Sequence, residues 1–379
     1  MALTTKRTLL SLYARLALPL FASASPAWVG TSAVSVPVGA SAALVPALTA
    51  FVTVPVLMTF GGPRAGAAEA YDEGKDLHAA NKLNLDWLRT ALSLQRHTEW
   101  VSQNTDKEVA DKLKANGWNQ EGGIIHGPGK SGLQAYVAWN GPADAVVVSF
   151  RGTLSNDAWE TVYNIITDAQ FVIMKKLKFI EKYDKIKVHR GFYDDYEAVR
   201  DVILERVRKH PDMKVYVVGF SLGGALAALC ALDIKVNEKR PVVGYFLAAP
   251  RVGGEDFRNA INAELSNVFR ITLRDDPVPR IPGVTTIVGE SRYEHVGRLL
   301  PLYPDGKLVP TDKIEARIEV DSLSALVSAF TSYHQRDAYR KAIKAYYDKC
   351  QAASSANCGT SGDILKESAT AELEDSKER

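Results

Sequence analysis

The stretch VYVVGFSLGGALAALCALDI, residues 215–234, decides the fold. Its first part, Val215–Phe220, is rich in β-branched and aromatic residues and predicts a buried strand. Its second part, Leu222–Ile234, is rich in alanine and leucine and predicts a helix. Ser221 stands at the junction, within the motif GFSLG. A G-x-S-x-G motif between a strand and a helix is typical of the sharp turn that exposes a nucleophilic serine.

The sequence on either side alternates between strand-like and helical patterns. Strands are expected at Leu133–Trp139, Ala145–Phe150, Val242–Pro250 and Val268–Leu273, the first two as a hairpin or a sequential pair. Helices are expected within Lys75–Gln103 and at Asp106–Asn116, Gly191–Arg208, Glu255–Leu265 and Gln335–Lys349. Strands that alternate with helices predict an α/β fold with a mostly parallel central sheet and helices on both faces.

The first 68 residues differ from the rest of the 379-residue chain. Residues 1–68 contain no Asp or Glu, and a second apolar run, Leu44–Phe60, precedes small residues and an acidic stretch. This pattern predicts a targeting or signal segment that is removed, and a membrane anchor is the less favoured alternative. The destination is an organelle, with the plastid as one option, or secretion. Residues 69–350 are expected to form one catalytic domain, and the polar residues 351–379 a disordered tail.

Charge and cysteine content exclude several function classes. The net charge of +2, from 46 basic and 44 acidic residues, gives no concentrated basic face for nucleic acid. The three cysteines lack the spacing of a structural metal site, and no metal or organic cofactor is expected. Cys230 lies in an apolar helical run and is expected to be a buried thiol. Whether Cys350 and Cys358 form a disulfide depends on the compartment.

A serine nucleophile needs a base, which a carboxylate must orient. In the predicted fold the chain order is serine, then Asp or Glu, then histidine. His295 and His334 are the candidate bases, because each lies downstream of Ser221 with a carboxylate between. Asp275 and Asp276 follow the strand Val268–Leu273, where the orienting acid belongs. Spacing alone leaves both pairs open.

The region from about Leu133 to Tyr339 resembles the fungal-type, or class 3, triacylglycerol lipases of the α/β-hydrolase superfamily. The motifs that carry this resemblance occur in the family's order over about 200 residues. They are FRGT (residues 150–153), VHRGF (188–192), VGFSLGGALA (218–227), APRVG (249–253) and DPVPRIP (276–282).

The resemblance implies a role for each site residue. Ser221 would be the nucleophile, Asp276 the orienting acid and His334 the base, with His295 as a packed strand histidine. The backbone N–H groups of Thr153 and Leu222 would form the oxyanion hole. Many members carry histidine where this chain has Phe220, and that side chain is expected to pack in the sheet.

Two segments beside the expected site have alternative interpretations. Asp157 and Glu160 have the spacing of a capping box, and the helix they begin is either a mobile lid, as in the family, or a fixed wall. The lysine-rich stretch Phe171–Val188 favours a solvated helix that covers the core over a surface for anionic membranes.

Together these features predict a serine carboxylic ester hydrolase that works through an acyl-enzyme. Its substrate would be an acylglycerol, a membrane glycerolipid or a small ester, with peripheral contact at a lipid interface. The alternatives are a non-catalytic lipase-like module and an acyltransferase or thioesterase that uses the same residues. The sequence leaves acyl-chain and head-group specificity and the oligomeric state open.

Overall fold

The computed structural model describes residues 85–127, 132–152, 174–282, 287–288, 291–309 and 323–353. The chain divides into two units, Met1–Thr53 and Val54–Arg379, and every described residue belongs to the second. The expected targeting segment, the lid or wall helix after Thr153 and the tail beyond Ala353 lie outside the described residues.

A seven-stranded sheet runs through the domain in the order β1-β2-β3-β6-β7-β8-β11. Strands β1 to β3 pair antiparallel, and the pairs from β3 to β11 are parallel. Two small antiparallel pairs, β4 with β5 and β9 with β10, lie outside the sheet. The bounds are β1 (Asn119–His126), β2 (Gln134–Asn140), β3 (Ala145–Phe150), β4 (Met174–Lys176), β5 (Lys187–His189), β6 (Lys214–Phe220), β7 (Val242–Leu247), β8 (Val268–Leu273), β9 (Ile287–Val288), β10 (Ser291–Arg292) and β11 (Arg298–Leu302).

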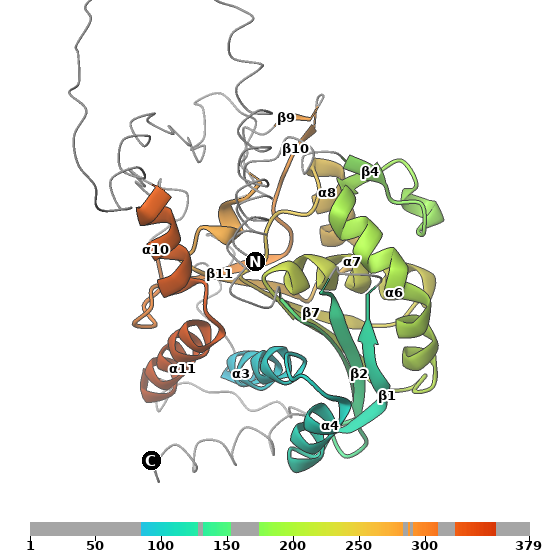
Figure 1. The fold of residues 1–379 in the computed structure, drawn as a ribbon, viewed down its shortest axis with the longest axis horizontal. Coiled ribbons are helices and arrows are strands. Elements are labelled where there is room, and N and C mark those ends of the chain that lie inside the picture. Colours follow the sequence, from blue (N-terminus) through green and yellow to red (C-terminus); the bar gives the residue numbers. More distant parts are fainter. Residues whose placement is uncertain are drawn as a thin grey trace, which may run out of the picture. The chain divides into compact units, whose positions relative to one another are not determined.

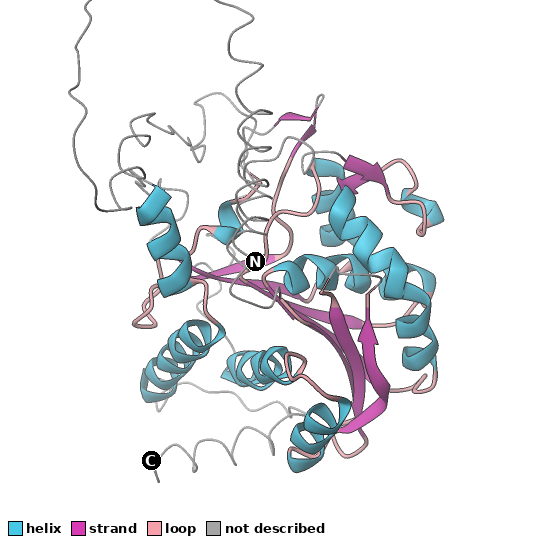
Figure 2. Cartoon of the chain, viewed as in Figure 1, coloured by secondary structure: helices cyan, strands magenta, loops and turns pink. Residues whose placement is uncertain are grey.

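Helices cover both faces of this sheet (Figures 1 and 2). One face carries α3 (Leu85–Trp100), α4 (Asp106–Ala115) and α11 (Arg336–Ala353), and the other carries α6 (Arg190–Arg208), α7 (Leu222–Asn237) and α8 (Glu255–Glu264). The helix α10 (Leu323–Tyr333) precedes α11, and the short 3-10 helices are η3 (Glu181–Tyr183) and η4 (Val278–Arg280). The expected α/β architecture is therefore confirmed.

Strand β6 shows how the sequence fills both faces. Successive side chains of a strand point to opposite sides of its sheet. Val215 and Val217 accordingly belong to the core beneath α6, α7 and α8, whereas Tyr216, Val218 and Phe220 belong to the core beneath α3 and α11. All of these side chains are buried, which explains why β6 is apolar without alternation.

Most of the expected elements are present, and two of them, β3 and β8, have the expected bounds. The segment Phe171–Val188 is the main correction. Its described part is the β4–β5 hairpin with η3 between the strands, and not a helix. The side chains of Leu177, Ile180 and Ile186 are buried in the core and stabilise this hairpin. The segment therefore contributes apolar side chains to the core without forming an α-helix.

Two further observations concern the helices. None of those formed by the described residues is long and apolar enough to cross a membrane. Cys230 is fully buried in α7, as expected, and burial raises the pKa of its thiol. Cys350 is a free thiol, and Cys358 lies outside the described residues.

A buried histidine lies between α3 and the sheet. The ring of His97 packs edgewise on Trp100 and Trp118, each with its ring centroid 4.7 Å away. Its Nδ1 lies 2.8 Å from the hydroxyl of Tyr136. Burial, with a smaller effect of the Arg96 charge, lowers the pKa of His97 from 6.5 to about 3.

This burial predicts a specific loss of stability in acid. Below pH 6.5 the unfolded chain binds a proton at His97 that the folded protein excludes down to about pH 3. The free energy of unfolding should therefore fall as the pH decreases across this window, by up to about 1.4 kcal/mol per pH unit for this group. His97→Gln should remove this contribution, so that one fewer proton is taken up on unfolding in this pH window. Urea unfolding at several pH values measures it.

The matched control is His126→Gln, at an exposed position in β1. It should keep the pH dependence of the wild type. An unchanged slope in His97→Gln would show that His97 is protonated in the folded protein.

Candidate active site

Ser221 occupies a strained turn between β6 and α7. Its backbone has φ 59° and ψ −126°, a conformation that costs a non-glycine residue roughly 1–3 kcal/mol. It is also the residue that precedes the first turn of α7, whose N–H groups point toward it. Ser221 is 5% exposed.

Two glycines let the turn close. A Cβ atom on Gly219 would lie 2.0 Å from the carbonyl oxygen of Gly223. A Cβ atom on Gly223 would lie 2.4 Å from the carbonyl oxygen of Phe150 in β3. Both contacts involve backbone atoms, which cannot move aside as a flexible side chain can. The small residues of the motif therefore set the position of α7 against both strands.

His334 bridges Ser221 and Asp276. Its Nε2 lies 2.7 Å from Ser221 Oγ, and its Nδ1 lies 2.8 Å from Asp276 Oδ2 and 3.0 Å from Oδ1. The three residues are 5%, 6% and 0% exposed for Ser221, His334 and Asp276. The structure thus brings together three side chains that are more than fifty residues apart in sequence.

The loop after β8 presents Asp276 inward. Val278 donates a backbone hydrogen bond of 2.9 Å to Asp276 Oδ1, and the hydroxyl of Tyr339 donates one of 2.7 Å to Oδ2. The neighbouring Asp275 instead pairs with Arg274 at 2.7 Å and is partly exposed. The geometry therefore distinguishes the two aspartates that spacing left open.

The residue expected to be the base lies next to α10, a helix that sequence analysis did not identify. His334 directly follows α10, and its backbone N–H bonds the carbonyl of Phe330 at 2.9 Å. The contact of Tyr339 with Asp276 was also not predicted. A tyrosine among the apolar residues of a helix is common in core helices and gives no sign of a role in a site. The hydroxyl of Tyr339, buried and beside Asp276, has a raised pKa and remains protonated.

The two residues expected in the oxyanion hole differ in what the structure describes. Leu222 is the first residue of α7, directly after Ser221. Thr153 lies outside the described residues. Its neighbour Gly152 is described, and a Cβ atom there would lie 3.3 Å from Ser221 Cβ. The chain that leads to Thr153 therefore passes next to the serine.

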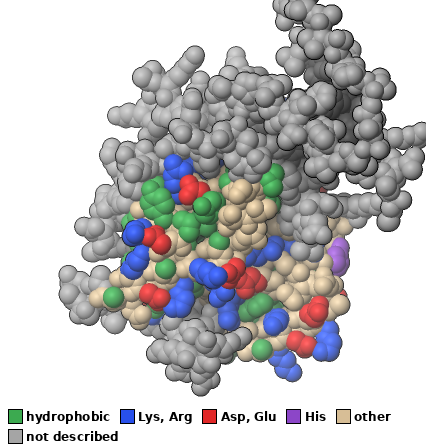
Figure 3. Space-filling view, turned by 60° about the vertical axis from the view of Figure 1, so that its left-hand side comes forward, with side chains coloured by type: hydrophobic (Ala, Val, Ile, Leu, Met, Phe, Trp, Pro, Cys, Tyr) green, Lys and Arg blue, Asp and Glu red, His purple; other side chains and the backbone are tan. Residues whose placement is uncertain are grey.

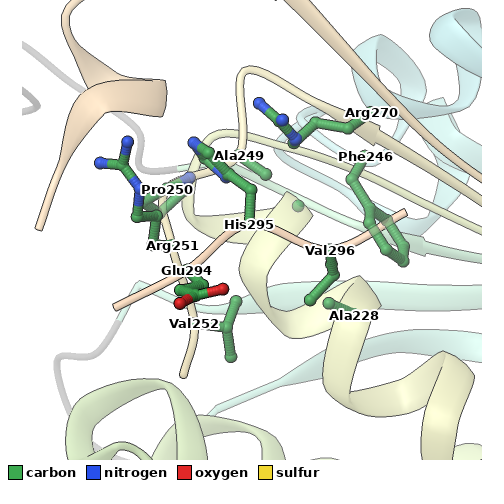
Figure 4. Close-up of a pocket in the computed structure, with 11 residues that line it drawn as sticks. Ala228, Phe246, Ala249, Pro250, Arg251, Val252, Arg270, Glu294, His295 and Val296 are labelled. Atoms are coloured by element: carbon green, nitrogen blue, oxygen red, sulfur yellow. The ribbon is translucent and has the colours of Figure 1, made fainter. Parts of the chain in front are cut away.

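His295 lines a pocket together with residues of α7 and β7 (Figure 4). The nitrogen-bearing ends of His295, Arg251 and Arg270 lie on one side, and Glu294 points the other way. Burial, with the charges of Arg270 and Arg251, holds the pKa of His295 well below its usual range, and its ring bonds the backbone of Pro279. These contacts describe a packed, neutral histidine without a bond to Ser221.

No cluster of three His, Cys, Asp or Glu side chains that could hold a metal ion occurs among the described residues. On the face shown in Figure 3, basic and acidic side chains alternate and form no single basic patch. In α11, Lys344 forms an ion pair of 2.8 Å with Asp348.

Comparisons with known proteins identify a matching family for part of the chain. Residues 147–286 match the family model described as lipase (class 3). The matched segment contains Ser221 and Asp276, whereas His334 lies beyond it.

Two curated relatives and one solved structure illustrate the likeness. A secreted mono- and diacylglycerol lipase 1 of Fusarium solani is 32% identical over 159 residues, or 41% of this chain and 44% of the relative. Phospholipase A1-IIgamma of Arabidopsis thaliana is 28% identical over 186 residues, or 41% of each chain. The chain therefore spans less than half the length of these relatives.

The structure of nonglycosylated LIP2 lipase from Yarrowia lipolytica is 18% identical, with a TM-score of 0.50. The match covers 68% of this chain and 93% of that one. This likeness concerns the fold. The segment around Ser221, residues 147–286, therefore carries the sequence pattern of the class 3 lipase family.

Proposed function

We propose that this protein is a serine carboxylic ester hydrolase, a lipase that acts on acylglycerols or membrane glycerolipids through an acyl-enzyme. The observation that carries the proposal is the continuous path of hydrogen bonds from Ser221 through His334 to Asp276. A serine, an imidazole and a buried carboxylate in this order are the groups that acyl transfer requires.

The proposed reaction has two halves. His334 Nε2 takes the proton of Ser221 while Oγ attacks the ester carbonyl, and the resulting imidazolium then protonates the departing alcohol. This leaves the acyl group on Ser221. In the second half His334 takes a proton from water, the hydroxide attacks the acyl carbonyl, and the fatty acid leaves as Ser221 recovers its proton.

Each neighbouring group has a role in these steps. Asp276 holds Nδ1 of His334, so that Nε2 faces Ser221 and the imidazolium is stabilised when it forms. The backbone N–H groups of Leu222 and Thr153 would bind the tetrahedral oxyanion, and the N-terminus of α7 places further positive potential there. All of these steps use this chain's own residues.

The names of the relatives support the substrate class and the location. The relatives named mono- and diacylglycerol lipase and phospholipase A1 support a glycerolipid ester as substrate, met at a lipid interface. The relative named as secreted supports a location outside the cytosol for this chain after removal of residues 1–68. It gives no support to the plastid option.

Removal of the proposed nucleophile gives the first test. Ser221→Ala should lower ester hydrolysis by on the order of 10⁴-fold or more, because no acyl-enzyme can form. His334→Ala should cause a similar loss, and His295→Ala a much smaller one. Initial rates on a series of esters of increasing chain length, with and without a lipid interface, measure these effects.

Asp276→Asn should lower the rate of hydrolysis, because Asp276 contacts His334. Asp275→Asn is the matched control, because Asp275 pairs with Arg274 instead. Full activity in purified Ser221→Ala would refute the proposal. A fluorophosphonate probe that leaves Ser221 unlabelled in the wild type would indicate a non-catalytic module. Products that carry the acyl group on an alcohol or amine would instead identify an acyltransferase.

The hydroxyl of Tyr339 gives a finer test. Tyr339→Phe keeps the buried ring and removes one of the hydrogen bonds that Asp276 accepts, a loss worth about 1.5–3 kcal/mol for a charged acceptor. The kcat should fall by roughly 10-fold or more while KM stays close to the wild-type value, because the ester does not touch this hydroxyl. Tyr347→Phe, another buried tyrosine of α11, is the control. Equal kinetics in the two variants would exclude the role of Tyr339.

A further inference from the structure

The side chains around the proposed base form a closed ring of contacts. His334 bonds Asp276, and Asp276 accepts a bond from Tyr339. The ring of Phe220 meets the ring of Tyr339 edge to face, with centroids 5.4 Å apart and an interplanar angle of 89°. Phe220 also lies against the imidazole of His334 at 5.0 Å. The phenyl group of Phe220 therefore closes the cycle of contacts, because it touches both His334 and Tyr339.

Other groups fix the orientation of this phenyl group. Phe220 is 4% exposed and belongs to the core beneath α3 and α11. The guanidinium of Arg336, the first residue of α11, lies 5.3 Å from the centroid of the Phe220 ring. A cation over an aromatic face is attracted to it, more strongly where water is excluded. Burial here is enough to lower the pKa of Arg336.

A second phenyl group contacts the same imidazole. Phe330 stacks on His334 with centroids 4.9 Å apart and an interplanar angle of 29°. Phe330 comes from α10 and Phe220 from β6, so two elements distant in sequence pack on one ring. Aromatic packing on the imidazole adds to the hydrogen bonds at its two nitrogens and opposes rotation of the ring.

Phe220 can act only through packing. Its side chain has no hydrogen-bonding group. The side chain can therefore neither exchange a proton with His334 nor compete with Tyr339 for Asp276. It is also the residue directly before Ser221, which makes its position as fixed as the turn itself. A small displacement of the His334 ring would lengthen the 2.7 Å contact between its Nε2 and Ser221 Oγ.

We propose that Phe220 is a positioning residue, whose ring holds His334 and Tyr339 in register with Ser221. Since the role of His334 belongs to the proposed function, this inference rests on it. Sequence analysis expected Phe220 to pack in the sheet, and the structure shows that the packing partners are the base and the tyrosine that supports its acid.

The experiment compares two variants at this one position. Phe220→Leu keeps an apolar side chain and removes the aromatic ring, whereas Phe220→His keeps a planar ring and is the residue that many family members carry. Any effect on the turn at Ser221 is common to both. Phe220→Leu should lower kcat by about 10- to 100-fold, the scale expected for a misplaced catalytic group, with KM unchanged. Phe220→His should stay closer to the wild type.

A spectroscopic measurement reports the same contact without catalysis. The proton that His334 Nδ1 shares with Asp276 should give a downfield resonance in protein labelled with nitrogen-15 at histidine. Phe220→Leu should broaden or abolish that resonance through exchange with solvent, and Phe220→His should retain it. Phe246→Leu, a buried ring of the opposite core, is the control for volume loss and should leave the resonance intact.

The outcomes separate the two proposals. Wild-type kcat and an intact resonance in Phe220→Leu would overturn the positioning role, as would equal losses in the Leu and His variants. If the wild type hydrolyses no ester, the proposed function fails, and the resonance still shows whether Phe220 holds the imidazole.

Discussion

The approach of α7 to β3 and β6 is the constraint on which the site depends. Gly219 and Gly223 leave no room for a Cβ atom, and the turn between them holds Ser221 at a positive φ. The hydroxyl therefore projects from the end of β6 instead of joining the sheet. The free energy that this conformation costs is offset by the two apolar cores on either side of the sheet, which fix the strand and the helix independently of the turn.

Local sequence predicted the elements whose patterns are unambiguous. The apolar runs of β3, β6 and β8 and the small residues of α7 gave the parallel part of the sheet and the position of Ser221. The strands β1 and β11 were missed because glycine and proline interrupt their sequences, NQEGGIIH and RLLPL, and their pairing comes from neighbouring strands. The β4–β5 hairpin was predicted as a helix because its segment is rich in apolar residues and lysine, a composition that both structures allow.

The site shows the same division between local and long-range information. Spacing could suggest two aspartates and two histidines, and the family resemblance chose one of each. The structure brings the chosen pair to Ser221 and gives the other two different partners, Arg274 for Asp275 and the backbone of Pro279 for His295. Tyr339, Phe330 and Phe220 acquire their roles only through tertiary contacts, so no pattern in a single sequence could have identified them.

The placement of His334 beyond the segment that matches the family model has a practical consequence for how such chains are recognised. A gene product truncated anywhere between residues 287 and 333 would retain the whole matched segment, with its serine and its aspartate, and would still be recognised as a lipase. It would nevertheless lack His334, the proposed proton acceptor, and all of α11. For chains that carry this serine motif, the presence of the downstream histidine and the helix after it is therefore a more complete criterion of the proposed activity than the motif alone.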